Sequence, residues 1–322
     1  MLAGALEGRR VLITGGTGFI GHHVSRLLTR SGAAVTVLHS PGGELPDDAD
    51  GRIIEARLGE DDVVYSACEG MHAVVHLAAR SGGIQLQHTD HAELFAENLR
   101  ITRQVLQATR RAAVPRVYLA SSAVVYGTAA ATPLREDAPK VDPGTAAATG
   151  YAWSKLTDEA LGRWMSSNEH AVVIGRLANV YGPGAMFDPE RSTVVHALVR
   201  KAVDQAPGGT LLVWGSGHAV RSFIFVEDAA RAVVAILTRG EPGRVYNIDT
   251  SEAVSIRQLA ETVREVVDPS LRLVFDADRP SGPPFRVLDV TALRGLGFEV
   301  RTSLREGLAH TVDAYRASIR PA

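Results

Sequence analysis

Short runs rich in β-branched residues alternate, along the first half of the chain, with longer segments of helical pattern. Such alternation is typical of βαβ units, in which parallel strands are joined by helices that cover both faces of the sheet. We therefore expect an α/β fold with a doubly wound parallel sheet over residues 8–180. The predicted strands lie in residues 10–15, 34–39, 51–56, 72–79, 116–122 and 171–177.

The alternation ends near Tyr181, where the segment "GPGAMFDPE" predicts a turn region rich in glycine and proline. The helices and short strands expected after it follow no strict order. We predict a first domain over residues 1–180 and a smaller, interleaved C-terminal α/β lobe over residues 181–322, part of which returns to the first domain. The chain has 322 residues, of which 45% are hydrophobic, and this is enough to form a sizeable core.

The overall charge argues against several classes of partner. The chain has 34 basic and 36 acidic residues, a net charge of −2, and no cationic run that would bind nucleic acid. Its single cysteine, Cys68, excludes an internal disulfide and a multi-cysteine metal site. Because no long apolar run and no signal peptide is recognisable, we expect a cytoplasmic protein that binds neither membrane nor metal.

A glycine-rich turn follows the first predicted strand. Residues Val11–Thr14 lead into Gly15, Gly18 and Gly21, and then into an amphipathic helical pattern. Glycines at this spacing allow a tight turn, bring backbone N–H groups close to a pyrophosphate and pack the helix against the strand. A turn of this kind can also occur without a ligand, but the strand–turn–helix context favours a dinucleotide site.

Tyr151 and Lys155 open a later helical segment, "YAWSKLTDEALGRWM". Their spacing of four residues places both side chains on one helical face. A free phenol has a pKa near 10, and a nearby ammonium group favours the phenolate, which makes proton transfer possible at neutral pH. A helix can carry this pair by chance. The preceding glycine turn and the serines at the end of the 116–122 strand make a catalytic pair the better interpretation.

These motifs together resemble the extended short-chain dehydrogenase/reductase family, the NAD-dependent epimerases and dehydratases, whose Rossmann-fold members act mostly on nucleotide sugars. The resemblance implies that Tyr151 transfers a proton at the sugar oxygen, Lys155 holds the nicotinamide ribose and Ser122 hydrogen-bonds the same oxygen. It assigns Ser121 a structural role. Asn98 matches an asparagine that supports the site from a neighbouring helix, although it could also be an ordinary surface residue.

The same resemblance implies which residues bind the cofactor. The end of the second strand carries no carboxylate that would repel a 2′-phosphate, so NADPH is favoured over NADH. No arginine stands there to bind the phosphate, but Arg57 occupies a position where relatives often carry an adenine-contacting aspartate, and it is a candidate contact for the phosphate. The predicted cofactor-binding residues are Gly15, Thr17, Gly18, Phe19, Ile20, Gly21, His39, Ser40, Arg57, Leu77, Ala78, Ala79, Asn98, Tyr151 and Lys155.

Several segments resemble the GDP-fucose synthase branch of the family: residues 76–85, 179–201, 213–230 and 286–297. Lys201, Arg221 and Arg286 become candidate contacts for the diphosphate of a nucleotide sugar, although each could instead form a surface salt bridge. The predicted substrate-binding residues are Ser81, Gly82, Ser122, Asn179, Thr193, Val194, Lys201, Trp214, Arg221 and Arg286.

Two departures from that branch limit the chemistry. GDP-fucose synthases epimerise C3 and C5 with a cysteine and a histidine, but this chain has Val124 and Thr193 at the corresponding positions. His196 lies three residues further on and is a possible substitute. The dehydratases of the family carry an acid at the Val124 position, often after an Asp where this chain has Ala123. The residues that remain suffice only for hydride transfer at one carbon.

The leading hypothesis is an NADPH-dependent 4-ketoreductase of a nucleotide-linked 4-keto-6-deoxyhexose, with dTDP favoured as the nucleotide, in the synthesis of deoxysugars for secondary metabolites. The alternatives are a UDP- or dTDP-hexose 4-epimerase with tightly bound NAD, a GDP-fucose synthase, and a non-catalytic NADP-sensing protein. The apolar content of the helical runs 94–113 and 152–167, and their pairing in the family, favour a homodimer through a four-helix bundle.

Overall fold

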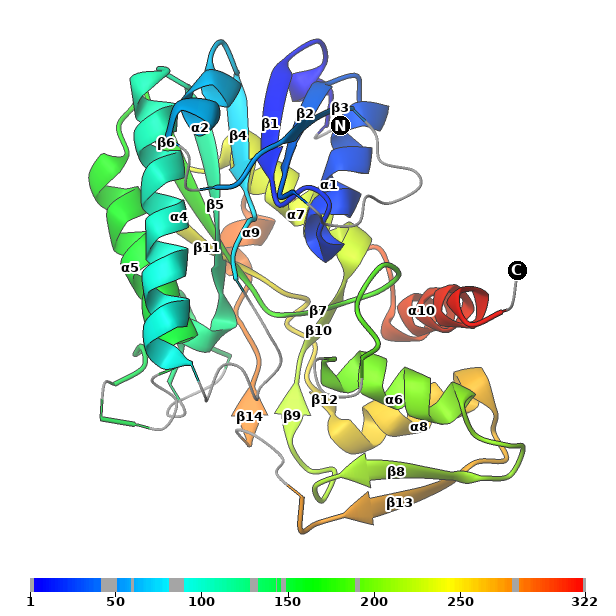
Figure 1. The fold of residues 1–322 in the computed structure, drawn as a ribbon. Helices are drawn as coiled ribbons and strands as arrows, with labels where there is room; N and C mark the ends of the chain where they lie inside the picture. The colour runs from blue at the N-terminus through cyan, green and yellow to red at the C-terminus, as the bar shows by residue number, and fades with distance from the viewer. Residues whose placement is uncertain are drawn as a thin grey trace.

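A seven-stranded sheet forms the centre of the protein (Figure 1). The computed structural model describes residues 3–41, 51–58, 61–80, 90–127, 133–142, 144–145, 149–188, 192–279 and 284–320. The sheet has the order β11-β6-β5-β4-β1-β2-β3, and all neighbouring strands are parallel. Six of its strands confirm the predicted ones: β1 (Arg10–Thr14), β2 (Ala34–His39), β3 (Arg52–Glu55), β4 (Ala73–His76), β5 (Arg116–Ser122) and β6 (Ala171–Leu177).

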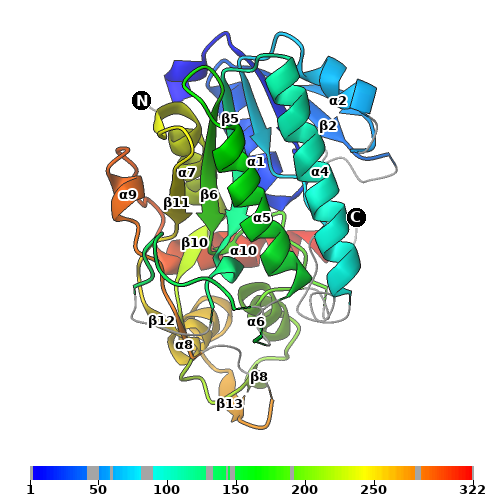
Figure 2. The same cartoon turned by 90° about the vertical axis from the view of Figure 1, so that its left-hand side faces the viewer.

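Helices cover both faces of this sheet, and Figure 2 looks onto one of these faces. In β1, Val11 and Ile13 point into one apolar core and Leu12 into the other, because side chains alternate along a strand. The first core is closed by α1 (Phe19–Arg30) and α7 (Val226–Arg239), and the second by α2 (Asp61–Cys68), α4 (His91–Arg111) and α5 (Gly150–Met165). The predicted doubly wound α/β sheet is therefore confirmed.

The seventh strand comes from a distant part of the chain. Strand β11 (Val245–Ile248) pairs with β6, with Val245 opposite Ile174, and so extends the sheet at the edge beyond β6. Helix α7 precedes it and packs against β5 and β6. The sequence patterns did not predict this strand, because four buried residues within an irregular region do not differ from a short helical or loop segment.

A second, smaller set of elements lies below the sheet in Figure 1, beyond the carboxyl ends of its strands. Its helices share one apolar core with three small sheets. The helices are α6 (Val194–Val203), α8 (Ile256–Val267) and α10 (Leu304–Ser318). The strand pairs are β7 (Asn179–Tyr181) with β10 (Phe223–Phe225), β8 (Thr210–Trp214) with β13 (Arg272–Asp276), and β9 (Val220–Arg221) with both β12 (Val254–Ser255) and β14 (Phe285–Arg286).

Short helical elements connect these parts. The 3₁₀ turn η1 (Ala3–Leu6) precedes β1, the turn η2 (Ala123–Val125) follows β5, and α9 (Thr291–Arg294) follows β14. Within the described ranges, none of the helices combines the length and apolar character needed to span a bilayer.

Candidate active site

The glycine turn after β1 forms an open helix N-terminus. Gly15 has a φ of 70°, and a Cβ there would lie 2.7 Å from the backbone nitrogen of Ala78. A Cβ on Gly21 would lie only 2.0 Å from the carbonyl oxygen of Gly15, so helix α1 packs directly on the turn. Gly18 caps α1 without a side-chain hydrogen bond, and the first turn carries no acidic residue. The N–H groups of a helix N-terminus whose first turn has no acidic residue fit a pyrophosphate.

The segment after β4 lies against this turn. The backbone N–H of Leu77 donates to the carbonyl oxygen of Thr14 at 3.1 Å, and the N–H of Ala78 donates to the Thr14 hydroxyl at 3.4 Å. Asn98, which is buried on α4, accepts from the N–H of Arg80 at 2.7 Å and donates to its carbonyl oxygen at 3.0 Å. Asn98 is therefore not an ordinary surface residue; it fixes the backbone that follows Ala79. The predicted residues Ser81 and Gly82 lie outside the described residues.

The end of β2 borders the same turn. The His39 ring is buried and its Nδ1 lies 2.9 Å from the Thr17 hydroxyl oxygen. Ser40 follows at an exposed position, and Arg57 is exposed two residues after the neighbouring strand β3. These positions suit contacts with the adenosine half of a dinucleotide, since ligands bind at the carboxyl ends of strands in doubly wound folds.

Tyr151 and Lys155 lie one turn apart at the start of α5, beside the end of β5. The Thr149 side chain caps α5 by accepting from the N–H of Ala152 at 3.2 Å, which places Tyr151 in the first turn. The Lys155 ammonium is buried, lies 5.9 Å from the centre of the Tyr151 ring and donates to the carbonyl oxygen of Ala120 at 3.2 Å. A positive charge is thus held next to the phenol.

The two serines at the end of β5 differ in their surroundings. Ser121 is buried and donates to Glu159 at 2.6 Å, which gives it the structural role expected of it. Ser122 ends the strand, and its hydroxyl oxygen accepts from the N–H of Val124 at 3.4 Å. Because this bond uses the hydroxyl only as an acceptor, its hydrogen is available for a ligand oxygen.

Two arginines lie side by side in the second set of elements. Arg221 and Arg286 are opposite each other in the parallel pair β9 and β14. Burial and the positive charge of Arg286 lower the pKa of Arg221 to about 10, and burial lowers the pKa of Arg286. Neighbouring cations in a half-buried position favour a polyanion such as a diphosphate. Asn179 donates to the carbonyl oxygen of Ser222 at 2.9 Å and so ties β7 to the adjoining strand.

Lys201 and Trp214 also come together, at the edge of the β8–β13 pair. The Lys201 ammonium lies 4.8 Å and the Arg279 guanidinium 5.2 Å from the Trp214 ring, which is 49% exposed. Lys201 also donates to the carbonyl oxygen of Leu212 at 3.3 Å. Burial, Arg200 and Arg279 lower the pKa of Lys201. Sequence reasoning missed Arg279, because nothing in its local pattern marks it.

Thr193 and Val194 begin α6, where His196 is buried between aromatic rings. The His196 ring lies 5.9 Å from Phe19 and 5.2 Å from Phe187, between ring centres. Its Nδ1 is hydrogen-bonded to the Thr193 hydroxyl at 2.8 Å, and its Nε2 accepts from the N–H of Gly182 at 3.3 Å. Burial lowers the pKa of His196 to about 4. Both ring nitrogens are engaged, so the expectation that His196 could act as an epimerisation base does not fit.

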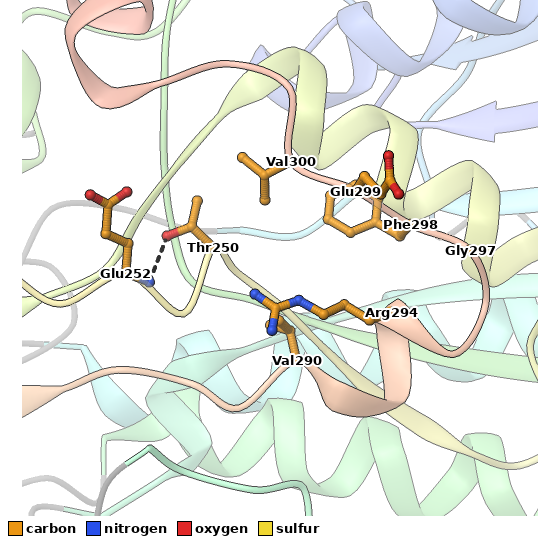
Figure 3. A pocket seen from close by; sticks show the side chains of 8 residues that line it. All are labelled: Thr250, Glu252, Val290, Arg294, Gly297, Phe298, Glu299 and Val300. Carbon is orange, nitrogen blue, oxygen red and sulfur yellow. Dashed lines mark hydrogen bonds between the residues drawn. The ribbon is translucent and has the colours of Figure 1, made fainter.

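A separate pocket of about 490 Å³ lies between the end of β11 and the segment around α9 (Figure 3). The Arg294 side chain points across it toward Thr250 and Glu252. The residues that line it are Thr250, Glu252, Val290, Arg294, Gly297, Phe298, Glu299 and Val300. None of the predicted cofactor- or substrate-binding residues is among them, so the pocket is distinct from the candidate active site.

Comparison with known proteins identifies the family of this chain. Residues 11–249 match the model of the NAD dependent epimerase/dehydratase family. The chain belongs to this family. It is 34% identical to putative GDP-L-fucose synthase 2 from Oryza sativa subsp. japonica, over 97% of this chain and 87% of that protein. It is 33% identical to a dTDP-4-dehydro-6-deoxy-D-allose reductase from Streptomyces bikiniensis, over 99% and 100% of the two chains.

A solved structure agrees with this assignment. DesIV, a dTDP-glucose 4,6-dehydratase from Streptomyces venezuelae crystallised with NAD, is 28% identical and superposes with a TM-score of 0.80, over 96% of this chain and 97% of that chain. The predicted membership in the extended short-chain dehydrogenase/reductase family is therefore confirmed. The protein is a nicotinamide-dependent oxidoreductase of this family.

The buried state of His196 makes a testable prediction about stability. A histidine whose pKa falls from 6.5 to about 4 on folding resists protonation in the folded state, so stability is lost as the pH falls through this range. Between pH 7 and pH 5, the wild-type protein should therefore lose about 2 kcal/mol more unfolding free energy than the His196→Asn variant. Urea denaturation at both pH values measures this difference.

Replacement of the exposed His218 by Asn serves as the matched control and should leave the pH dependence unchanged. If the His196→Asn variant and the wild-type protein lose equal stability over this range, His196 is not held neutral in the folded protein.

Proposed function

We propose that the protein is an NADPH-dependent 4-ketoreductase of a nucleotide-linked 4-keto-6-deoxyhexose, with dTDP as the nucleotide. The observation that carries this proposal is a complete Ser122, Tyr151 and Lys155 group beside two positions that cannot exchange protons with carbon. These positions hold Val124 and Thr193, neither of which has a group that titrates near neutral pH, and the possible substitute His196 has a pKa that burial lowers to about 4. Hydride transfer at C4 needs only the first group, whereas epimerisation at C3 and C5 needs an acid–base pair.

The cofactor supplies a hydride to the sugar carbonyl carbon when it is bound. The protein then has to stabilise and protonate the oxygen on which negative charge develops. Ser122 donates a hydrogen bond to this oxygen, Tyr151 gives up its phenolic proton to it, and the Lys155 ammonium stabilises the phenolate that Tyr151 becomes. Lys155 has one N–H left for a ribose hydroxyl, since Ala120 and Asp158 accept from the other two.

Two observations favour the dTDP-linked ketosugar and NADPH. The Streptomyces bikiniensis reductase, named for a dTDP-linked sugar, aligns with 99% of this chain, and the structural neighbour DesIV also acts on a dTDP-sugar. The end of β2 presents His39 and Ser40 rather than a carboxylate, which leaves room for the 2′-phosphate of NADPH. Arg57, exposed beside this edge, is our candidate contact for that phosphate.

Incubation with NADPH and a panel of dTDP- and GDP-4-keto-6-deoxyhexoses in deuterated water tests this function. We expect NADPH consumption with a dTDP substrate and no deuterium at C3 or C5. Tyr151→Phe should reduce kcat/KM by about 100-fold or more, because the proton donor is lost. It should leave NADPH binding, followed by fluorescence, nearly unchanged.

The opposite outcomes identify the alternatives. Deuterium at C3 or C5 would indicate a GDP-fucose synthase type of reaction. Release of bound NAD on denaturation, without net NADPH consumption on a ketosugar, would indicate a 4-epimerase. Unchanged activity of Tyr151→Phe in every assay would favour a non-catalytic, NADP-sensing protein.

Arg221 and Arg286 are proposed to bind the diphosphate of the substrate. Arg221→Ala and Arg286→Ala should each raise the KM for the nucleotide sugar by about 10-fold or more and change kcat much less, because a charge-assisted hydrogen bond to the ground state is lost. Steady-state kinetics measure both constants. Arg305→Ala, which removes an exposed arginine paired with Glu265, is the control. An unchanged KM in both variants would exclude this binding mode.

We also propose a homodimer in which α4 and α5 of two subunits form a four-helix bundle. The two helices pack side by side on the outside of the sheet (Figure 2). On these two helices Trp164 is 78% exposed, and Phe95, Leu99 and Trp153 are partly exposed. Large apolar side chains that remain exposed on two neighbouring helices favour a protein contact.

Light scattering coupled to size exclusion at micromolar concentration should therefore give twice the chain mass for the wild-type protein. Trp164→Glu should shift it toward the monomer, because a charge would be buried without a partner. Val274→Glu, at an exposed apolar position on β13, should remain dimeric. A monomeric wild-type protein would rule out this interface.

A further inference from the structure

Asp158 is a buried carboxylate that lies directly behind the proposed catalytic pair. It stands one turn after Lys155 on α5, and its Oδ2 lies 3.2 Å from the Lys155 ammonium. The side chain of Asp158 is 0% exposed and that of Lys155 is 3% exposed. Its Oδ1 has no hydrogen-bond partner among the described residues. A buried carboxylate with an unsatisfied oxygen is costly, so stability alone does not account for it.

Among the described titratable groups near Lys155, Asp158 supplies the negative charge that pairs with the ammonium group. From α5, Glu159 also faces this region, but both of its oxygens are bound by Arg176 of β6, at 2.7 Å each. From β4, His76 is buried; burial and the charge of Lys155 lower its pKa to about 3, so it is neutral. The charge of Asp158 is therefore the one that balances the ammonium group.

Asp158 also has a hydrogen-bond partner on α4, Thr102, which in turn contacts His76 of β4. Burial has the largest effect and raises the pKa of Asp158, whereas the charge of Lys155 and the hydrogen bonds from Lys155 and Thr102 lower it. The Thr102 hydroxyl is in turn 3.3 Å from His76 Nε2, and His76 Nδ1 is 2.7 Å from the Thr14 hydroxyl. This chain of contacts orients the carboxylate and adds no further charge.

We propose that Asp158 is a positioning residue for the reduction: its carboxylate keeps the Lys155 ammonium charged and directed at Tyr151. This inference rests on the proposed function only for its consequence in catalysis. During the reaction the O–H bond of Tyr151 breaks, the proton moves to the sugar oxygen, and the electron pair stays on the phenolate. A charged Lys155 stabilises that phenolate, whereas a neutral amine would not.

Burial alone would lower the pKa of Lys155, but the charge of Asp158, then that of Tyr151 and the hydrogen bond that Lys155 donates to Asp158, raise it overall. In Asp158→Asn the opposing carboxylate charge is absent while the burial is unchanged. We therefore expect Lys155 to lose its proton about one pH unit or more lower than in the wild-type protein.

The chain has only three lysines, Lys140, Lys155 and Lys201, so this change can be observed directly. NMR of protein labelled with ¹³C at the lysine ε-carbon gives three resolved positions to follow with pH, without substrate. We expect the Lys155 signal to move to a lower midpoint in Asp158→Asn, while Lys140 and Lys201 keep theirs. Asp158→Ser provides a second, smaller substitution if the Asn variant does not fold.

Asp228→Asn is the matched control, because Asp228 is also a fully buried helical carboxylate but binds the backbone of Arg301 and Thr302. It should not change the Lys155 titration. An unchanged Lys155 midpoint in both Asp158 variants overturns the proposal, whatever the substrate proves to be.

The catalytic consequence is measured separately as the pH dependence of kcat with a ketosugar that the wild-type enzyme reduces. The alkaline loss of kcat should begin about one pH unit or more lower in Asp158→Asn, with KM for the sugar changed little. An unchanged kcat profile, despite a shifted Lys155 signal, would refute the catalytic part. If the wild-type enzyme reduces no ketosugar, the proposed function fails, and the NMR titration still decides whether Asp158 keeps Lys155 charged.

Discussion

The buried ion pair between Arg176 and Glu159 determines how the parts of the active site meet. The Arg176 side chain is fully buried, and its nitrogens bind both oxygens of Glu159, the Tyr126 hydroxyl and the carbonyl oxygen of Glu136. Breaking such a pair typically costs several kcal/mol, because a charge would remain buried without a partner. The pair therefore fixes α5 and the segment after β5 on the carboxyl end of β6.

This arrangement also decides which serine faces the site. Ser121 donates to Glu159 and so points toward the ion pair, and because side chains alternate along a strand, Ser122 points the other way. Tyr126 continues the network by donating to Asn247 of β11 at 2.6 Å, which ties the distant seventh strand to the same group. The position of Ser122 thus depends on contacts among residues that lie as far apart in the sequence as Ser121 and Asn247.

The two halves of the candidate site differ in how their charged side chains are arranged. Within the sheet layer, the cations Lys155 and Arg176 are each matched by a carboxylate on α5. In the second set of elements, cations approach one another instead: Arg221 lies next to Arg286, and Lys201 and Arg279 share the Trp214 ring. The first arrangement suits proton transfer, in which charge must be balanced at each step. The second suits binding of a polyanionic substrate.

The sequence by itself determined the fold class, six strands of the sheet, the glycine turn and the Tyr151–Lys155 pair. These features depend on local patterns: strand and helix periodicity, a turn that only glycine permits, and a spacing of four residues on one helix. The helix that carries Tyr151 and Lys155 also carries Asp158 and Glu159 at helical spacing, a signal that sequence reasoning could have used. Only the tertiary structure decided that β11 joins the sheet, that His196 is buried with both nitrogens bound, and that Asp158 balances Lys155. The first depends on pairing with a strand distant in sequence, and the other two depend on burial, which decides whether a side chain in a protein interior carries a charge.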